Sequence, residues 1–190
     1  MTDAALLSVL DGVDPLSAVA DEPAIGAVDV AQLAAVDGAE EQLVAVAGDA
    51  QAPAARRYAA AEALLEGTFD GWRSSPAAAA SVAAALAAAM RSDTSHNRWG
   101  LPGQFAGRLG EELLSLPSGV EDALLPLLDD ASPLMIEGSE AATIATDAGY
   151  RISDLAAYLL RLHRGLPADA AADIAKRDRA NAALARELAT

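Results

Sequence analysis

The sequence predicts an all-α protein, and two observations carry this prediction. Alanine supplies 49 of the 190 residues, and alanine and leucine have the highest intrinsic helix propensities. Strand patterns are scarce, because β-branched and aromatic residues rarely alternate with polar ones over four or more positions. The chain is 53% hydrophobic and has no cysteine, so it can fill a core but cannot form a disulfide scaffold or a thiolate zinc site.

Proline residues that follow a candidate capping residue mark the starts of several helices, because a proline at the first helical position loses no hydrogen bond. The pairs are Asp14-Pro15, Glu22-Pro23 and Ser75-Pro76. Ser118 followed by Glu121 predicts a capping box before the apolar run 120–128. Together these marks predict helices at about 4–11, 15–21, 29–36, 39–48, 53–66, 76–91, 103–115, 120–129, 151–164 and 169–188.

Short connections predict that successive helices pack as antiparallel hairpins within one helical-repeat domain spanning residues 1–190. Acidic helices occupy 1–36, helix pairs follow over 37–164, and a capping helix closes the chain at 165–190. An insertion at about 131–149 interrupts the second pair, and we expect a loop there. Long loops in compact repeat proteins are often functional, so this insertion is a candidate recognition surface.

Two stretches share one layout: a first helix, a short turn with Asp or Pro, and a second helix that starts near an Arg and continues with Ala and Leu. The first stretch is 41–65, which includes Pro53-Ala54-Ala55-Arg56-Arg57-Tyr58, and the second joins 123–130 to 150–160. This layout resembles HEAT-like repeats, most strongly over 120–188, which is similar to bacterial proteins with HEAT-type repeats. The resemblance implies a short right-handed α-solenoid, a stack of antiparallel helix pairs.

The helical spacing of apolar residues supports such stacking independently of the resemblance. In the 151–164 helix, one face carries Ile152, Leu155, Ala156, Leu159, Leu162 and His163. A short amphipathic helix cannot bury such a face alone and needs neighbours. In the last helix, Asp178 and Asn181 fall on the stripe that faces inward, so either the stripe is half covered or these two groups find partners.

Five acidic residues surround the insertion: Asp129, Asp130, Glu137, Glu140 and Asp147. Their oxygens suit calcium or magnesium, but their spacing matches no calcium-binding loop. Paired carboxylates can also act as general acid and base, although nothing in the sequence fixes their separation. We therefore predict no metal ion, no cofactor and no catalytic residue, and treat these acids as a possible interaction surface.

The scarce aromatic residues complete that possible surface. Trp72 precedes Arg73, and Trp99 follows Arg98 in a polar loop that also contains His96. Exposed Trp and Arg often anchor interfaces, whereas a Trp that closes the end of a helical core is the more common arrangement. His96 alone, without a second His or a Cys nearby, is a weak metal ligand.

Glycine spacing in the middle of the chain excludes two phosphate-binding motifs. Gly100, Gly103, Gly107 and Gly110 match neither the dinucleotide fingerprint nor a Walker A loop. Because the last three are four and three residues apart, we expect them to share one face of the 103–115 helix and to allow close helix packing.

The formal charge of −15 makes binding to a phosphate backbone unfavourable, so direct nucleic-acid binding is not expected. The first fifty residues hold ten acids and no base, and the last forty hold seven bases against five acids. The sequence shows no signal peptide, and its longest uncharged apolar run, Ala77 to Met90, is too short to span a bilayer. We therefore expect a cytoplasmic protein.

Three functions fit these observations. The leading hypothesis is a noncatalytic protein–protein interaction module, a HEAT-like scaffold or adaptor, because amphipathic helices stack and no catalytic constellation is assembled. An acidic inhibitor, immunity protein or nucleic-acid mimic that binds a basic partner is the first alternative. An all-helical enzyme or small-ligand binder is the second, and a deep pocket lined by Trp99, His96 and the acids of 129–147 would favour it.

Overall fold

A computed structural model describes residues 2–13, 23–168, 170 and 173–188. The described chain is mostly helical, which confirms the predicted all-α class, and its strands form one short two-stranded sheet. The chain divides into two compact units, residues 1–92 with 116–119 and residues 93–115 with 120–190. The predicted helix at 15–21 lies outside the described residues. Among the described helices, none is long and apolar enough to cross a bilayer.

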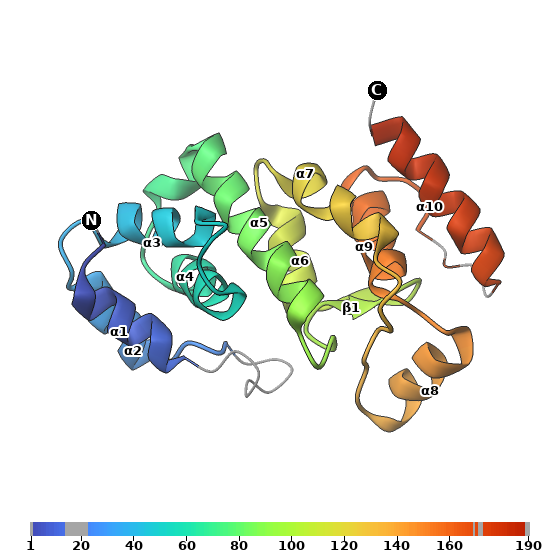
Figure 1. The fold of residues 1–190 in the computed structure, drawn as a ribbon, viewed down its shortest axis with the longest axis horizontal. Helices are drawn as coiled ribbons and strands as arrows, with labels where there is room; N and C mark the ends of the chain where they lie inside the picture. The colour runs from blue at the N-terminus through green and yellow to red at the C-terminus, as the bar shows by residue number, and fades with distance from the viewer. Residues whose placement is uncertain (1, 14–22, 169, 171–172, 189–190) are drawn as a thin grey trace. The chain divides into compact units, whose positions relative to one another are not determined.

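The first unit is built from helices that follow one another along the chain, drawn from blue to green in Figure 1. Its α3, α4 and α5 pack against one another, and α1 and α2 pack against α4. These elements are α1 (Ala4–Gly12), α2 (Ala27–Ala34), α3 (Ala39–Gly48), α4 (Ala54–Glu66), the 3-10 helix η1 (Gly71–Ser74) and α5 (Pro76–Ser92).

Helix α4 is the centre of the first unit, because its seven successive residues 58–64 are all buried. Alanine makes this possible, since its small side chain lets neighbouring helices approach on every side. The start of α5 at Pro76 confirms the sequence prediction, and the Ser75 hydroxyl accepts a hydrogen bond from the Ala78 amide at 3.3 Å. Of the other two predicted starts, Asp14-Pro15 lies outside the described residues, and no helix begins at Pro23, because α2 starts only at Ala27.

The second unit contains the remaining elements, drawn from green to red in Figure 1. They are β1 (Gly100–Leu101), β2 (Phe105–Ala106), α6 (Arg108–Ser115), α7 (Val120–Leu124), the 3-10 helix η2 (Leu125–Asp129), α8 (Ser139–Ala148), α9 (Ile152–His163) and α10 (Ile174–Leu188).

Helix α9 is the core of the second unit, and its residues 152–160 are all buried. Helices α6, α7 and α10 and the 3-10 helix η2 pack around it. The predicted apolar face is buried as far as Leu159, whereas Leu162 and His163, in the last turn, are exposed. The predicted 120–129 helix changes to 3-10 geometry at Leu125, because Pro126 has no N–H with which to continue the α-helical pattern.

The glycine prediction is wrong, because the segment 103–107 is not helical. Gly103 lies in the tight turn of the β1–β2 hairpin with φ at 78°, a conformation that favours glycine, and α6 begins only at Arg108. Within α6, Gly110 does allow a close approach, since a Cβ there would lie 2.4 Å from the Trp99 carbonyl oxygen. The glycines therefore serve a hairpin and one close backbone contact rather than a common helix face.

Two further expectations differ from the structure. The capping box does not form: the Ser118 hydroxyl donates to the Pro76 carbonyl at 2.7 Å, and the Glu121 carboxylate accepts from the Arg164 guanidinium at 2.7 Å. The insertion at 131–149, expected as a loop, contains α8. Its one large apolar residue is Ile144, and only Ala145 among its described side chains is buried, so the sequence of α8 offers no run of leucine-sized residues for a core.

Candidate functional site

A buried carboxylate, Asp154, organises the polar centre of the second unit. Its side chain is 1% exposed and lies in the first turn of α9, where it accepts a hydrogen bond from the Arg151 backbone N–H at 3.0 Å. The Arg151 guanidinium binds the same carboxylate at 3.1 Å, and the Arg177 Nε lies 3.2 Å from it. Asn181 donates a fourth interaction at 3.3 Å. Two arginines and an amide therefore compensate for one buried charge.

Arg177 extends this network from α10 to the end of α8. Its Nη2 donates to the carbonyl oxygens of Ala148 at 2.7 Å and Gly149 at 3.0 Å, which lie at the C-terminus of α8. Its guanidinium carbon also lies 5.0 Å from the centre of the Tyr150 ring, a cation–π contact. One side chain thus joins α8, α9 and α10.

The structure decides between the two alternatives for the polar stripe of the last helix. Asn181 is buried and donates to Asp154, and exposed Asp178 accepts a hydrogen bond from Arg151 at 2.6 Å. Both polar groups therefore have partners, and the stripe is a hydrogen-bonded contact between α10 and the start of α9.

Two polar hollows flank this contact, and Asn181 lines both. The first, the α9–α10 hollow, lies beside the later turns of α9, and the second lies beside η2. Polar residues lining the first include Asp154, Tyr158, Arg161 and Arg177, and those lining the second include Asp129, Arg151, Ser153 and Asp178. Neither hollow is lined by Trp99 or His96, so the pocket that would favour an enzyme is not among them.

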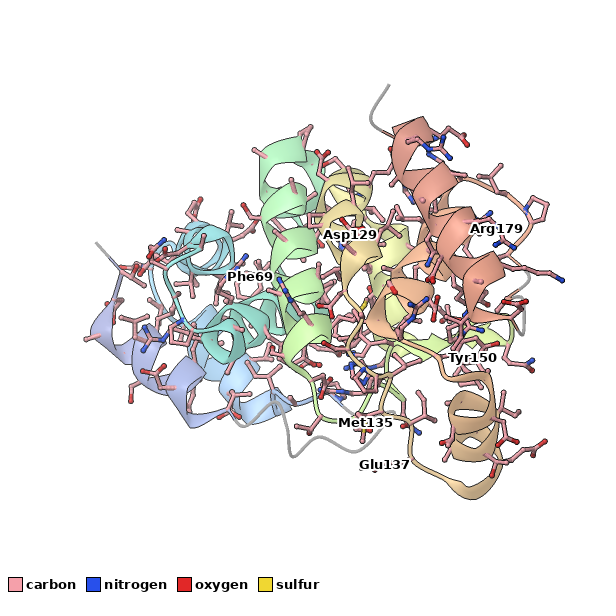
Figure 2. The ribbon with its side chains drawn as sticks, turned by 45° about the vertical axis from the view of Figure 1, so that its right-hand side comes forward. Phe69, Asp129, Met135, Glu137, Tyr150 and Arg179 are labelled. Carbon is pink, nitrogen blue, oxygen red and sulfur yellow. The ribbon has the colours of Figure 1, made fainter. Side chains whose placement is uncertain are left out.

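The segment 131–149, which we call the α8 arm, is held by side chains of the loop before the hairpin. The Asn97 amide pairs with both backbone groups of Glu137, each hydrogen bond being 2.8 Å long. His96 is buried, and its Nδ1 lies within hydrogen-bond distance of both backbone groups of Met135, 3.1 Å from the N–H and 3.2 Å from the carbonyl oxygen. In Figure 2, Met135 and Glu137 lie on the chain leading into α8. These contacts make His96 a structural tether of the arm.

Arg98 and Trp99, two other residues of the possible interaction surface, are buried in the same loop. The Asp93 carboxylate, 4% exposed, accepts hydrogen bonds from Arg98 at 2.9 Å and from the Trp99 indole at 3.0 Å. Trp72 is buried in the first unit, where the Arg73 guanidinium carbon lies 4.6 Å from the centre of its ring. Both tryptophans therefore pack in cores, and of these four residues only Arg73 is exposed.

The acidic residues of that surface have a different environment. Asp129, Glu137, Glu140 and Asp147 are exposed, and none forms an ion pair with another described residue. Asp130 is partly exposed and accepts a hydrogen bond from the Ser132 N–H at 3.0 Å. Within the described chain, no three His, Asp or Glu residues come together in a way that could hold a metal ion.

In comparisons with protein-family models, with curated proteins and with solved structures, no match to this chain was found.

Sequence reasoning missed the residues at the centre of the network, Arg151, Asp154 and Arg177. The sequence did carry a signal for the first two. Arg151 directly precedes the helix and Asp154 follows it by three residues, which is the spacing of a capping box. Arg177 carried no such signal, since it lies between Lys176 and Asp178 in a segment that reads as a solvated charged face.

Two tyrosines beside this network predict how stability depends on high pH. Burial raises the pKa values of Tyr150 and Tyr158 above 10, because a phenolate is poorly solvated there, and Arg177 opposes the shift at Tyr150 only in part. Between the unfolded and folded pKa values, the unfolded state has already lost the proton that the folded state retains. The free energy of unfolding should therefore fall as the pH rises above about 10.

Urea unfolding on either side of pH 10, with tyrosinate absorbance recorded in parallel, measures this dependence. Tyr158→Phe should reduce the slope, because it removes one of the two shifted groups. Full ionisation of all tyrosines near pH 10 in a protein that stays folded would contradict the assignment.

Proposed function

We propose that the protein is a noncatalytic protein–protein interaction module that binds a basic partner surface through the α8 arm. The observation that carries the proposal is the exposure of Glu137, Glu140 and Asp147 on the arm, without an ion pair to any described residue. Most of the other charged side chains described above, such as Asp93 and Asp154, already form ion pairs within the fold. Exposed acids without internal partners are available to attract a basic surface.

The charge pattern of the sequence strengthens this proposal. No Lys or Arg occurs between Arg108 and Arg151, a stretch that contains nine acids. The arm is also well placed for recognition, because α8 has few contacts with other helices, and Figure 1 shows it set apart from α6, α7 and α9. Hydrogen bonds hold the chain on both sides of α8, from Asn97 to Glu137 just before the helix and from Arg177 to Ala148 at its end. A partner would therefore meet a preorganised acidic surface.

The HEAT-like assignment is part of this proposal for the scaffold. Its support is that α3, α4 and α5 follow one another and pack together, and that α9 is covered on several sides by short helices. Such helix pairs suit a scaffold or adaptor. The exposed acids of the arm are also a feature of the first alternative, an acidic inhibitor or nucleic-acid mimic that binds a basic partner.

Affinity capture from a native lysate, with purified protein as bait, tests the function. We compare wild type with an arm variant, Glu137→Gln, Glu140→Gln and Asp147→Asn, at low and high salt. The expected result is a defined basic protein that the arm variant retains about tenfold less well, because three rim charge pairs contribute about 1–2 kcal/mol together. Added salt should reduce wild-type capture towards that of the variant.

A matched control neutralises three exposed acids of the first unit that have no ion pair with a described residue. It consists of Asp37→Asn, Glu41→Gln and Asp70→Asn, which change the net charge by the same amount. Equal loss of capture by both variants would show that total charge, rather than the arm, attracts the partner. Recovery of no protein, together with turnover of a small molecule, would contradict the proposed function.

A further inference from the structure

The α9–α10 hollow has the size and composition of a small-ligand site. It has a volume of about 120 Å³, which suits a ligand of a few heavy atoms. Three alanines leave this space open, and polar side chains from both helices line it. The lining residues are Asp154, Ala157, Tyr158, Arg161, Ala170, Arg177, Ala180 and Asn181.

Arg161 is the side chain in this hollow with donors left for a ligand. It donates to the Ala180 carbonyl at 3.2 Å and forms no ion pair with another described residue. By contrast, Arg151 and Arg164 each bind two carboxylates. A guanidinium carries five N–H groups in a planar fork, which matches the geometry of a carboxylate.

Tyr158 adds a second donor to the hollow. Its side chain is buried, and its hydroxyl has no hydrogen bond to another residue that the structure describes. A tyrosine hydroxyl is protonated at neutral pH, and burial raises the pKa of Tyr158 further, so this hydroxyl can donate to an anion.

The charge lining the hollow discriminates among anions. Two cations, Arg161 and Arg177, face one anion, Asp154, so the lining carries one net positive charge. A monoanion neutralises this lining charge, whereas a dianion leaves a net negative charge in the partly enclosed hollow beside Asp154. The hollow beside η2 has the opposite balance, with Asp129 and Asp178 against Arg151.

We propose that the α9–α10 hollow binds a small monoanionic carboxylate, held by the Arg161 fork and by the Tyr158 hydroxyl. The carboxylate could belong to a free small acid or to the C-terminus of a peptide, and the chemistry of recognition is the same for both. The two proposed ligand contacts, Arg161 and Tyr158, lie outside the α8 arm, so this proposal can hold or fail independently of the proposed function.

Titration of the ¹⁵N-labelled full chain, followed by the arginine Nε–Hε signals in NMR spectra, tests the proposal. The probes are acetate, N-acetyl-alanyl-alanine, the C-terminal amide of that peptide, and inorganic phosphate at a pH above its second pKa, where it is mainly a dianion. We expect saturable shifts of the Arg161 and Arg177 signals with a dissociation constant in the millimolar range, as suits a ligand of four heavy atoms. The amide should not bind, and phosphate should bind more weakly than the carboxylates.

Three variants assign the effect to the hollow. Arg161→Gln should weaken acetate binding by about tenfold, since it removes the charge-assisted hydrogen bonds. Tyr158→Phe keeps the ring in place and should weaken binding by about threefold through the loss of one hydrogen bond, which keeps the test valid if Arg161→Gln fails to fold. Arg164→Gln is the matched control, because Arg164 lies outside the hollow on exposed carboxylates.

The two sources of the carboxylate give different results, and both support the site. Tighter binding of the peptide than of acetate assigns it to a chain terminus, and exclusion of the peptide assigns it to a free acid. Absence of saturable shifts with either carboxylate, tighter binding of phosphate, or equal weakening by Arg164→Gln would overturn the proposal.

Discussion

Replacing Asp154 by alanine is expected to lower the free energy of unfolding of the second unit by about 3–5 kcal/mol. The physical reason is the state of its partners after the change. Arg177 is 4% exposed on its side chain, and the change removes the buried carboxylate that lies 3.2 Å from its Nε. Arg151 loses the carboxylate that it shares with Arg177, and the buried Asn181 amide loses an acceptor.

Urea unfolding followed by tryptophan fluorescence measures this loss in the correct unit. The second unit contains Trp99 and the first contains Trp72, so a Trp72→Phe background reports on the second unit alone. Asp178→Asn is the matched control, because exposed Asp178 binds the same Arg151 and should cost no more than about 1 kcal/mol. A cost for Asp154→Ala as small as that of the control would show that the buried network does not hold the unit together.

A second large effect is expected in the first unit, where Glu62→Ala should cost about 3–5 kcal/mol. Glu62 is fully buried in α4 and accepts hydrogen bonds from the backbone N–H groups of Ala24 at 2.8 Å and Ile25 at 3.2 Å. The Tyr58 hydroxyl donates to its other oxygen at 2.7 Å. Alanine leaves two backbone donors and a hydroxyl without this acceptor, besides creating a cavity.

Graded variants separate the hydrogen bonds of Glu62 from its volume. Glu62→Gln keeps the size and one acceptor oxygen and should cost less than alanine. Tyr58→Phe removes a single hydrogen bond and should cost about 1–2 kcal/mol. Unfolding in a Trp99→Phe background reads out the first unit through Trp72. If all three variants unfolded at the wild-type urea concentration, the role assigned to Glu62 would be wrong.

The sequence predicted the helices well where local chemistry determines them. The start of α5 at Pro76 followed from a capping serine before a proline, and α3 and α4 lie within a residue or two of their predicted bounds. Tertiary structure overrode local preference in the 100–107 segment, where a hairpin replaces the first part of the predicted 103–115 helix. Helix α8 was missed for another reason, since it has few large apolar residues and is held by hydrogen bonds from Asn97 and Arg177.

The candidate site was predicted only in part, because sequence position does not reveal burial. His96, Arg98 and Trp99 were grouped as a possible interaction surface, with a tryptophan inside a helical core as the more common alternative, and the structure brings the three together inside the core. Their partner Asp93 went unnoticed, since one acid in a polar loop carries no signal. The exposed acids of the arm were identified from the sequence, because a charged residue without a basic neighbour to pair with is expected at the surface.

The carboxylates of this protein fall into two groups with different roles. Buried carboxylates such as Asp154 and Glu62 stabilise the fold through specific partners, whereas exposed acids of the α8 arm lack internal partners and are proposed to bind a basic surface. The first group should tolerate no neutralisation, and the second should tolerate it without loss of stability.

Calorimetric titration of the captured partner into wild type, the arm variant and the first-unit control variant tests this account most directly. The account predicts about tenfold weaker binding by the arm variant, near wild-type affinity for the control, and unchanged unfolding of both. Wild-type affinity in the arm variant, or equal losses in the two variants, would contradict it.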